Sequence, residues 1–128
     1  MLFRSDVGLA CLPTRAGEFR AAVAKCLTYA DALEVKKINC LAGRPVSGQE
    51  AAATETLIAN LRYAAEKFAE IGAAVLLEPV NPTDVPGFLI NRLQQAMDIV
   101  RLVDRPNVQL QFDLYHMAQI EPSLDKAI

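Results

Sequence analysis

The chain has 128 residues, of which 13 are Lys or Arg and 15 are Asp or Glu, so its formal net charge is −2. Hydrophobic residues make up 52% and charged residues 22%, a composition typical of one folded globular domain. The slightly acidic balance and the scattered basic residues argue against a nucleic-acid-binding protein. No apolar run reaches the roughly 18 residues that a membrane span requires. The segment from Met1 to Cys11 does not resemble a secretory signal.

The cysteine pattern indicates the cellular compartment. Cysteines 11, 26 and 40 are odd in number and contain no C-x-x-C pair. Free thiols in a reducing environment are therefore expected, rather than a disulfide framework or a zinc site. We expect a cytoplasmic protein without a membrane or nucleic-acid partner.

Helices and strands are expected to alternate along the first half of the chain. Apolar residues three and four positions apart predict a helix over residues 14–33, with Thr14 as its N-cap. A short buried strand is expected over residues 36–42. Residues 47–50 form a capping-box pattern, from which a second helix should extend to Gly72, a residue typical of left-handed helix ends.

The second half continues the alternation. An apolar run over residues 73–80 predicts a strand of the kind that is buried in a parallel sheet. Asn91 is expected to cap a third helix that ends before Pro106. Residues 108–116 alternate between apolar and polar side chains and predict a third strand, and a further helix is expected to begin at Pro122.

This order predicts right-handed βαβ units that form a parallel sheet. The strands recur about every 35 residues, so a closed eight-stranded barrel would need about 280 residues, whereas this chain has 128. We therefore predict an α/β fold with three to four βα units. Residues 1–128 would form a single partial TIM-barrel domain.

Two acidic residues are expected at the carboxyl ends of neighbouring strands. Gln109, Gln111 and Asp113 should face away from the helices, and Glu78 ends the preceding strand. Ligands bind at this edge in parallel α/β folds. Two carboxylates there repel each other unless a cation, a proton or a basic group intervenes, and oxygen ligands favour Mg²⁺ or Mn²⁺. His116, the only histidine, lies within reach of the same site. An ordinary solvated glutamate explains Glu78 equally well at this stage.

Two further polar residues are candidates for this edge of the sheet. Asn39, on the first expected strand, either faces the site or bonds to backbone groups in the core, and both alternatives stay open. Tyr115 is expected to cover the rim of the site.

Several motifs resemble those of the hydroxypyruvate isomerase family, within the xylose isomerase-like TIM-barrel superfamily. The superfamily-wide motifs are E-P-x-N at residues 78–81 and D-x-x-H at residues 113–116. The narrower motifs are N-C-L-A-G at residues 39–43 and P-G-F at residues 86–88. The resemblance covers nearly the whole chain.

The resemblance implies isomerisation of hydroxypyruvate to tartronate semialdehyde through an enediolate, assisted by a divalent metal ion. It implies that Glu78 and Asp113 are metal ligands and that Glu78 is also one of two acid/base glutamates. It further implies that His116, Asp84 and Asn81 contact the substrate. Family members are about twice as long, and the remainder of their fold supplies a further metal ligand and the second glutamate. We therefore expect weak Mg²⁺ or Mn²⁺ binding and no turnover by this polypeptide alone.

Two other interpretations stay open. One is a ketose 3-epimerase-like enzyme of the same superfamily, and the other is a non-catalytic half-barrel used for assembly or small-ligand binding. In every case the expected ligand is a small hydroxy-keto acid or a sugar. Three strands leave two sheet edges unpaired, so we also expect a homo-oligomer.

Overall fold

The computed structural model describes residues 8–120. Its elements alternate as expected, with a short 3-10 helix first and α4 last. In chain order they are the 3-10 helix Pro13–Arg15, α1 (Ala16–Ala32), β1 (Lys37–Cys40), α2 (Glu50–Ala69), β2 (Ala74–Leu77), α3 (Leu93–Val103), β3 (Val108–Leu110) and α4 (Leu114–Ile120).

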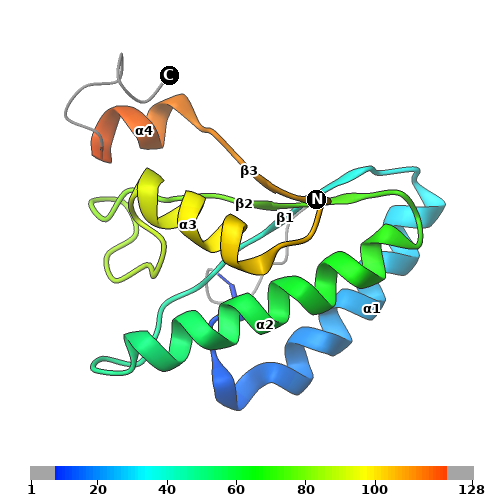
Figure 1. The fold of residues 1–128 in the computed structure, drawn as a ribbon, viewed down its shortest axis with the longest axis horizontal. Coiled ribbons are helices and arrows are strands. Elements are labelled where there is room, and N and C mark those ends of the chain that lie inside the picture. Colours follow the sequence, from blue (N-terminus) through cyan, green and yellow to red (C-terminus); the bar gives the residue numbers. More distant parts are fainter. Residues whose placement is uncertain (1–7, 121–128) are drawn as a thin grey trace.

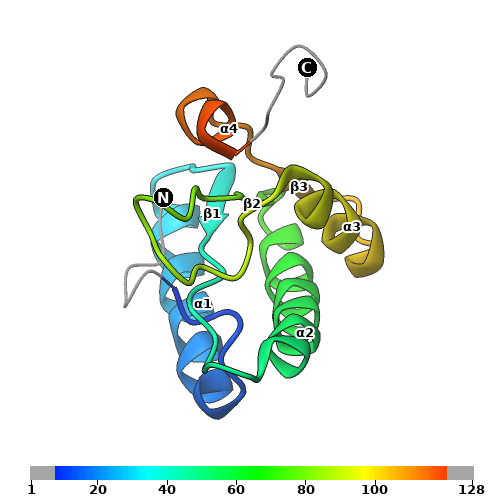
Figure 2. The same cartoon turned by 90° about the vertical axis from the view of Figure 1, so that its left-hand side faces the viewer.

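The three strands form one parallel sheet in the order β1-β2-β3. The register places Asn39, Leu76 and Gln109 side by side across it. Figures 1 and 2 show α1, α2 and α3 on one side of the sheet, whereas α4 lies beyond the carboxyl ends of the strands, on the other side. Parallel strands with helices outside them confirm the predicted part of a TIM barrel.

The face of the sheet that the helices cover carries the core. Ile38 and Cys40 of β1 and Val75 and Leu77 of β2 are fully buried. Apolar side chains from the three helices join them in one cluster, among them Phe19, Val23, Leu57, Leu61, Phe68, Ala96 and Ile99. The other face carries Asn39, which is half-buried, and Gln109, which is exposed. Alternation along the strands therefore separates the apolar core face from a face on which Leu76 lies between the polar side chains of Asn39 and Gln109.

The N-caps predicted for the first two helices are wrong. Thr14 lies inside the 3-10 helix, and the residue at the N-cap of α1 is Arg15, which makes no side-chain capping bond. At the start of α2 the N-cap is Gln49, again without a capping bond. The predicted capping box does not form, because Oε1 of Glu50 accepts a hydrogen bond from the backbone N–H of Gly48 at 3.3 Å and not from that of Ser47.

Asn91 does not cap the third helix. The N-cap of α3 is Arg92, in an extended conformation. The side chain of Asn91 instead donates from Nδ2 to the carbonyl oxygen of Phe88 at 3.2 Å, and its backbone N–H donates to Oε1 of Gln95. The side-chain amide of Asn91 therefore stabilises the loop before α3 and does not cap the helix.

The third strand is shorter than predicted. It ends at Leu110, and α4 begins at Leu114. Oδ1 of Asp113 accepts hydrogen bonds from the backbone N–H groups of Tyr115 at 2.9 Å and His116 at 3.3 Å, which is the geometry of a helix N-cap. This cap outweighs the alternating pattern, whose apolar members Phe112 and Leu114 remain exposed. The helix expected from Pro122 lies outside the described residues.

Two glycines are required by the backbone. Gly72 has φ of 67° and ends the second helix in the left-handed conformation, as predicted. Gly43 has φ of 96°, and a Cβ there would stand 2.5 Å from the carbonyl oxygen of Gly8. This close approach brings the first described residues against the end of β1, where the N–H of Cys11 donates to the carbonyl oxygen of Ala42 at 2.9 Å.

All three cysteines are buried. Burial raises the pKa of the Cys11 thiol to about 11 and that of Cys40 to about 12, so neither is a ready thiolate nucleophile. None of the helices between Gly8 and Ile120 has the length and apolar character needed to cross a lipid bilayer.

Candidate functional site

Glu78, Asp113 and His116 meet at the carboxyl edge of the sheet. Each offers one ligand atom that lies within 4.8 Å of the ligand atoms of the other two, and all three are half-buried. Glu78 directly follows β2, and Asp113 and His116 follow the neighbouring β3, to which β2 pairs in parallel. Parallel neighbours end at the same edge, so the topology brings both carboxylates together.

The environment of Glu78 disfavours its charged form. Burial raises the pKa of this carboxyl group, and the charge of Asp113 raises it further, while a hydrogen bond from Asn39 and the proximity of His116 act in the opposite direction. The bond from Asn39 runs from Nδ2 to Oε1 over 3.3 Å. A cation between the two carboxylates would reverse this balance.

Asp113 is fixed by the helix that it caps. Both of its capping bonds go to Oδ1. The carboxylate is therefore held in one orientation, and Oδ2 is left for a ligand.

Asn81 links the loop after β2 to His116. It is 0% exposed, and its Oδ1 accepts a hydrogen bond from the backbone N–H of Asp84 at 2.8 Å. Its Nδ2 lies 3.2 Å from Oδ2 of Asp84 and 2.8 Å from Nδ1 of His116. The backbone N–H of Asn81 also points at Nδ1 of His116, at 3.3 Å.

Asp84 lies on the surface beside this network. The hydroxyl group of Tyr115 donates to its Oδ2 at 2.6 Å. The hydrogen bonds from Tyr115 and Asn81 lower the pKa of Asp84. The hydrogen bond between Tyr115 and Asp84 also raises the pKa of Tyr115. Asp84 therefore stays ionised and Tyr115 stays a donor around neutral pH.

The five site residues predicted from the sequence fall into two connected groups. Glu78 and Asp113 face each other, whereas Asp84 and Asn81 reach the cluster through His116. Two more residues take part. Asn39 contacts Glu78, which settles the alternative left open for it, and Tyr115 contacts Asp84. The position of Asn39 on the polar face of its strand was the signal in the sequence, whereas nothing local indicated the partner of Tyr115.

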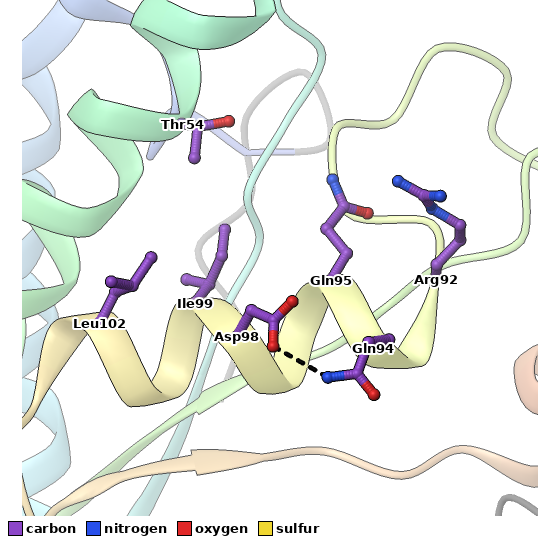
Figure 3. A pocket seen from close by; sticks show the side chains of 7 residues that line it. All are labelled: Thr54, Arg92, Gln94, Gln95, Asp98, Ile99 and Leu102. Atoms are coloured by element: carbon purple, nitrogen blue, oxygen red, sulfur yellow. Dashed lines mark hydrogen bonds between the residues drawn. The ribbon is translucent and has the colours of Figure 1, made fainter.

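A hollow in the surface lies away from this cluster. It is a groove of about 360 Å³ between α2 and α3, lined by Thr54, Arg92, Gln94, Gln95, Asp98, Ile99 and Leu102 (Figure 3). Nε2 of Gln94 donates to Oδ1 of Asp98 there at 2.8 Å. The groove shares no residue with the cluster of Glu78, Asp113 and His116.

Comparisons with known proteins agree with this geometry. The profile of the family described as xylose isomerase-like TIM barrel matches residues 3–127. The hydroxypyruvate isomerase of Escherichia coli is 42% identical over 118 residues, which are 91% of this chain and 46% of that protein. A 2-oxo-tetronate isomerase of Cupriavidus necator is 36% identical over 115 residues, which are 89% of this chain and 44% of that protein.

Solved structures show the same fold. A protein from Brucella melitensis, described as an AP endonuclease of family 2, aligns with a TM-score of 0.91 and 39% identity over 94% of this chain and 47% of that one. A D-psicose 3-epimerase from Clostridium cellulolyticum aligns with a TM-score of 0.81 and 25% identity over 96% of this chain and 45% of its own. The chain spans about half the length of the curated relatives it matches. Because the family profile covers nearly all of its residues, and its sheet and helices superpose on these barrels, the chain belongs to the xylose isomerase-like TIM-barrel family.

Proposed function

We propose that this chain supplies one half of the active site of a hydroxypyruvate isomerase-like enzyme. The observation that carries the proposal is the convergence of Glu78, Asp113 and His116 within 4.8 Å at the carboxyl edge of the parallel sheet. Enzymes with this fold place their catalytic groups at that edge.

The residues present fit a hard divalent cation such as Mg²⁺ or Mn²⁺. Two carboxylates supply oxygen ligands, and the pKa of Glu78 is raised by burial and by the charge of Asp113. In addition, Oδ1 of Asn39 is buried beside Glu78 and has no hydrogen-bond partner among residues 8–120. Glu78 and Asp113 are therefore the proposed metal ligands.

When bound, the cation would polarise the carbonyl and the neighbouring hydroxyl group of the substrate. Glu78 would take a proton from the hydroxyl-bearing carbon of the substrate and help to return it to the former carbonyl carbon, while the hydroxyl proton would pass to the former carbonyl oxygen. His116 would hold a substrate oxygen next to the two carboxylates. Asp84, at the rim and bonded to Tyr115, would contact the polar end of the substrate.

The proposed substrates are 2-oxo acids that carry an adjacent hydroxyl group. The names of the relatives, hydroxypyruvate isomerase and 2-oxo-tetronate isomerase, both describe isomerases of 2-oxo acids. Identities of 42% and 36% to these isomerases, against 25% to the D-psicose 3-epimerase, favour isomerisation over sugar epimerisation. Hydroxypyruvate, converted to tartronate semialdehyde, is the substrate that we propose.

Metal binding by this chain should be weak, because two carboxylates provide few of the roughly six oxygen ligands that such ions take.

We further propose that the chain forms a homo-oligomer in the cytoplasm. Within residues 8–120, β1 and β3 each pair along one edge only, and Phe112 and Leu114 are exposed near the end of β3. Light scattering after size-exclusion chromatography tests the assembly, and a monomer at all concentrations would contradict it.

Titration of the protein with Mn²⁺ by calorimetry tests the metal site. Glu78→Gln and Asp113→Asn are each expected to lower the affinity about tenfold or more. The second variant retains a residue that can cap α4, so the helix should survive. Glu55→Gln, the same change at an exposed site on α2, is the control and should bind like the wild type. Equal affinity for Mn²⁺ in the wild type and Glu78→Gln would contradict the proposal.

Conversion of hydroxypyruvate, followed by NMR, tests the reaction. The Escherichia coli relative serves as the positive control, and this chain alone is expected to give no turnover. Turnover by the chain alone would support the substrate but contradict the incomplete site. Mn²⁺ binding that hydroxypyruvate does not alter would favour the non-catalytic module instead.

A further inference from the structure

We propose that Asn81 is a positioning residue that holds His116 in the tautomer with its proton on Nε2. The ring would then present a hydrogen-bond donor, and not a lone pair, to the cluster of Glu78 and Asp113. The catalytic purpose of this arrangement rests on the proposed function, whereas the tautomer itself follows from the hydrogen bonds.

The orientation of the Asn81 amide is set by its neighbours. Oδ1 accepts a bond from the backbone N–H of Asp84, which is a donor without alternative. Nδ2 faces Oδ2 of Asp84, which is an acceptor. Turning the amide over would set oxygen against oxygen and N–H against N–H. Since Asn81 is 0% exposed, water cannot compensate for such mismatches.

This orientation fixes the role of the histidine ring. Nδ2 of Asn81 uses one hydrogen for Asp84 and directs the other at Nδ1 of His116, 2.8 Å away. The backbone N–H of Asn81 points at the same ring nitrogen. Nδ1 therefore accepts, and a neutral ring must carry its proton on Nε2.

A ring in this state has no free lone pair. Nδ1 is occupied by donors from Asn81, and Nε2 is occupied by its own proton. His116 then donates to a substrate oxygen that gains negative charge, and metal ligation is left to the carboxylates of Glu78 and Asp113. Tyr115 and Asp84 support the arrangement, because Asp84 accepts from both Tyr115 and Asn81.

Nitrogen-15 NMR of the ring tests the proposal directly, because His116 is the only histidine in the chain. Spectra are recorded with a chelator and without substrate, at a pH of about 9, where histidine is neutral. The wild type is expected to show a protonated nitrogen at Nε2 and an unprotonated one at Nδ1. A ring protonated mainly on Nδ1, or equally on both nitrogens, would overturn the proposal.

Two variants ask whether Asn81 is the cause. Asn81→Asp replaces the donor with an acceptor and is expected to move the proton to Nδ1. Asn81→Ala removes the stronger of the two donors and is expected to give a mixture of tautomers. Thr83→Asp adds the same charge at an exposed position two residues away and should leave the proton on Nε2.

A wild-type pattern in both Asn81 variants would overturn the role of this residue. A dispersed amide spectrum shows that a variant is folded. If Asn81→Asp does not fold, the comparison of Asn81→Ala with the wild type tests the role of Asn81 alone. The ring spectrum needs neither metal nor turnover. A failure of Mn²⁺ binding would therefore refute the proposed function without changing the tautomer seen in the ring spectrum. Likewise, a ring protonated on Nδ1 would refute the role of Asn81 without changing Mn²⁺ binding.

Discussion

Asn39 and Glu78 are joined by a hydrogen bond of 3.3 Å from Nδ2 to Oε1, although 39 residues separate them in the chain. The bond exists because β1 and β2 run in parallel with Asn39 opposite Leu76, and Glu78 stands two residues further along the same face. It lowers the pKa of a carboxyl group whose burial raises it. The charge of Glu78 thus depends on a residue of another strand.

Removal of the Glu78 charge should stabilise the metal-free protein at neutral pH. A folded-state pKa above the unfolded value stabilises the fold below the unfolded pKa, and this contribution is lost as pH rises through the folded pKa. At about pH 7 the ionised carboxylate of Glu78 therefore destabilises the folded state, and Glu78→Gln should be more stable than the wild type. Near pH 4, the ordinary value for glutamate, the gain should shrink.

Urea unfolding with a chelator at both pH values measures this difference. Glu55→Gln is the matched control, because it removes the same charge from an exposed position on α2. Glu78→Gln that is less stable than the wild type at pH 7 would contradict the burial effect.

Substitution of Asn39 should raise the pKa of Glu78 further. Asn39→Ala removes the hydrogen bond that favours the carboxylate, and Asn39→Asp adds a like charge, so the second variant should raise it more. Carbon-13 NMR of the Glu78 carboxyl group, titrated without metal, measures both effects. An unchanged pKa in Asn39→Asp would show that the two side chains are not in contact.

Arg62 should stabilise the packing of α2 against α3. Its Nε donates to the carbonyl oxygen of Val103 at 3.1 Å, and its Nη2 donates to that of Leu102 at 2.6 Å, where α3 ends. Arg62→Met should lower the free energy of unfolding by about 1–2 kcal/mol, because a charged donor is lost from two helix-end carbonyls. Denaturant unfolding measures the change.

Arg101→Met provides the comparison for that variant. Arg101 is exposed and forms an ion pair with Asp98 over 3.3 Å. Its loss should cost less than about 0.5 kcal/mol, as is usual for surface ion pairs. Equal losses from both arginines would contradict the capping role of Arg62.

Substitution of Asp104 by glycine should stabilise the protein. It ends α3 with φ of 53°, in the left-handed region that disfavours side chains. Asp104→Gly is expected to raise the free energy of unfolding by about 0.5 kcal/mol. Asp98→Gly, inside the same helix, should instead lower it by about 1 kcal/mol. Thermal unfolding of both variants measures the contrast, and the same sign in both would exclude this explanation.

The alternation of helices and strands could be predicted from the amino-acid pattern, and so could the edge of the sheet at which the acidic residues emerge. Apolar periodicity located α1, α2 and α3, and the motifs at residues 78–81 and 113–116 indicated the family. These features are local. Apolar periodicity and short motifs involve residues close together in the chain, so they can be recognised without knowing which other segment packs against them.

Which side chains meet depends on the tertiary structure, whereas the end of the third strand depends on a local competition. The alternation over residues 108–116 is compatible with a long strand, yet capping by Asp113 converts its second half into α4. The contacts of Asn39 with Glu78 and of Asn81 with His116 join residues 39 and 35 positions apart. Such partners depend on strand register and on the path of a loop, which a one-dimensional pattern does not contain.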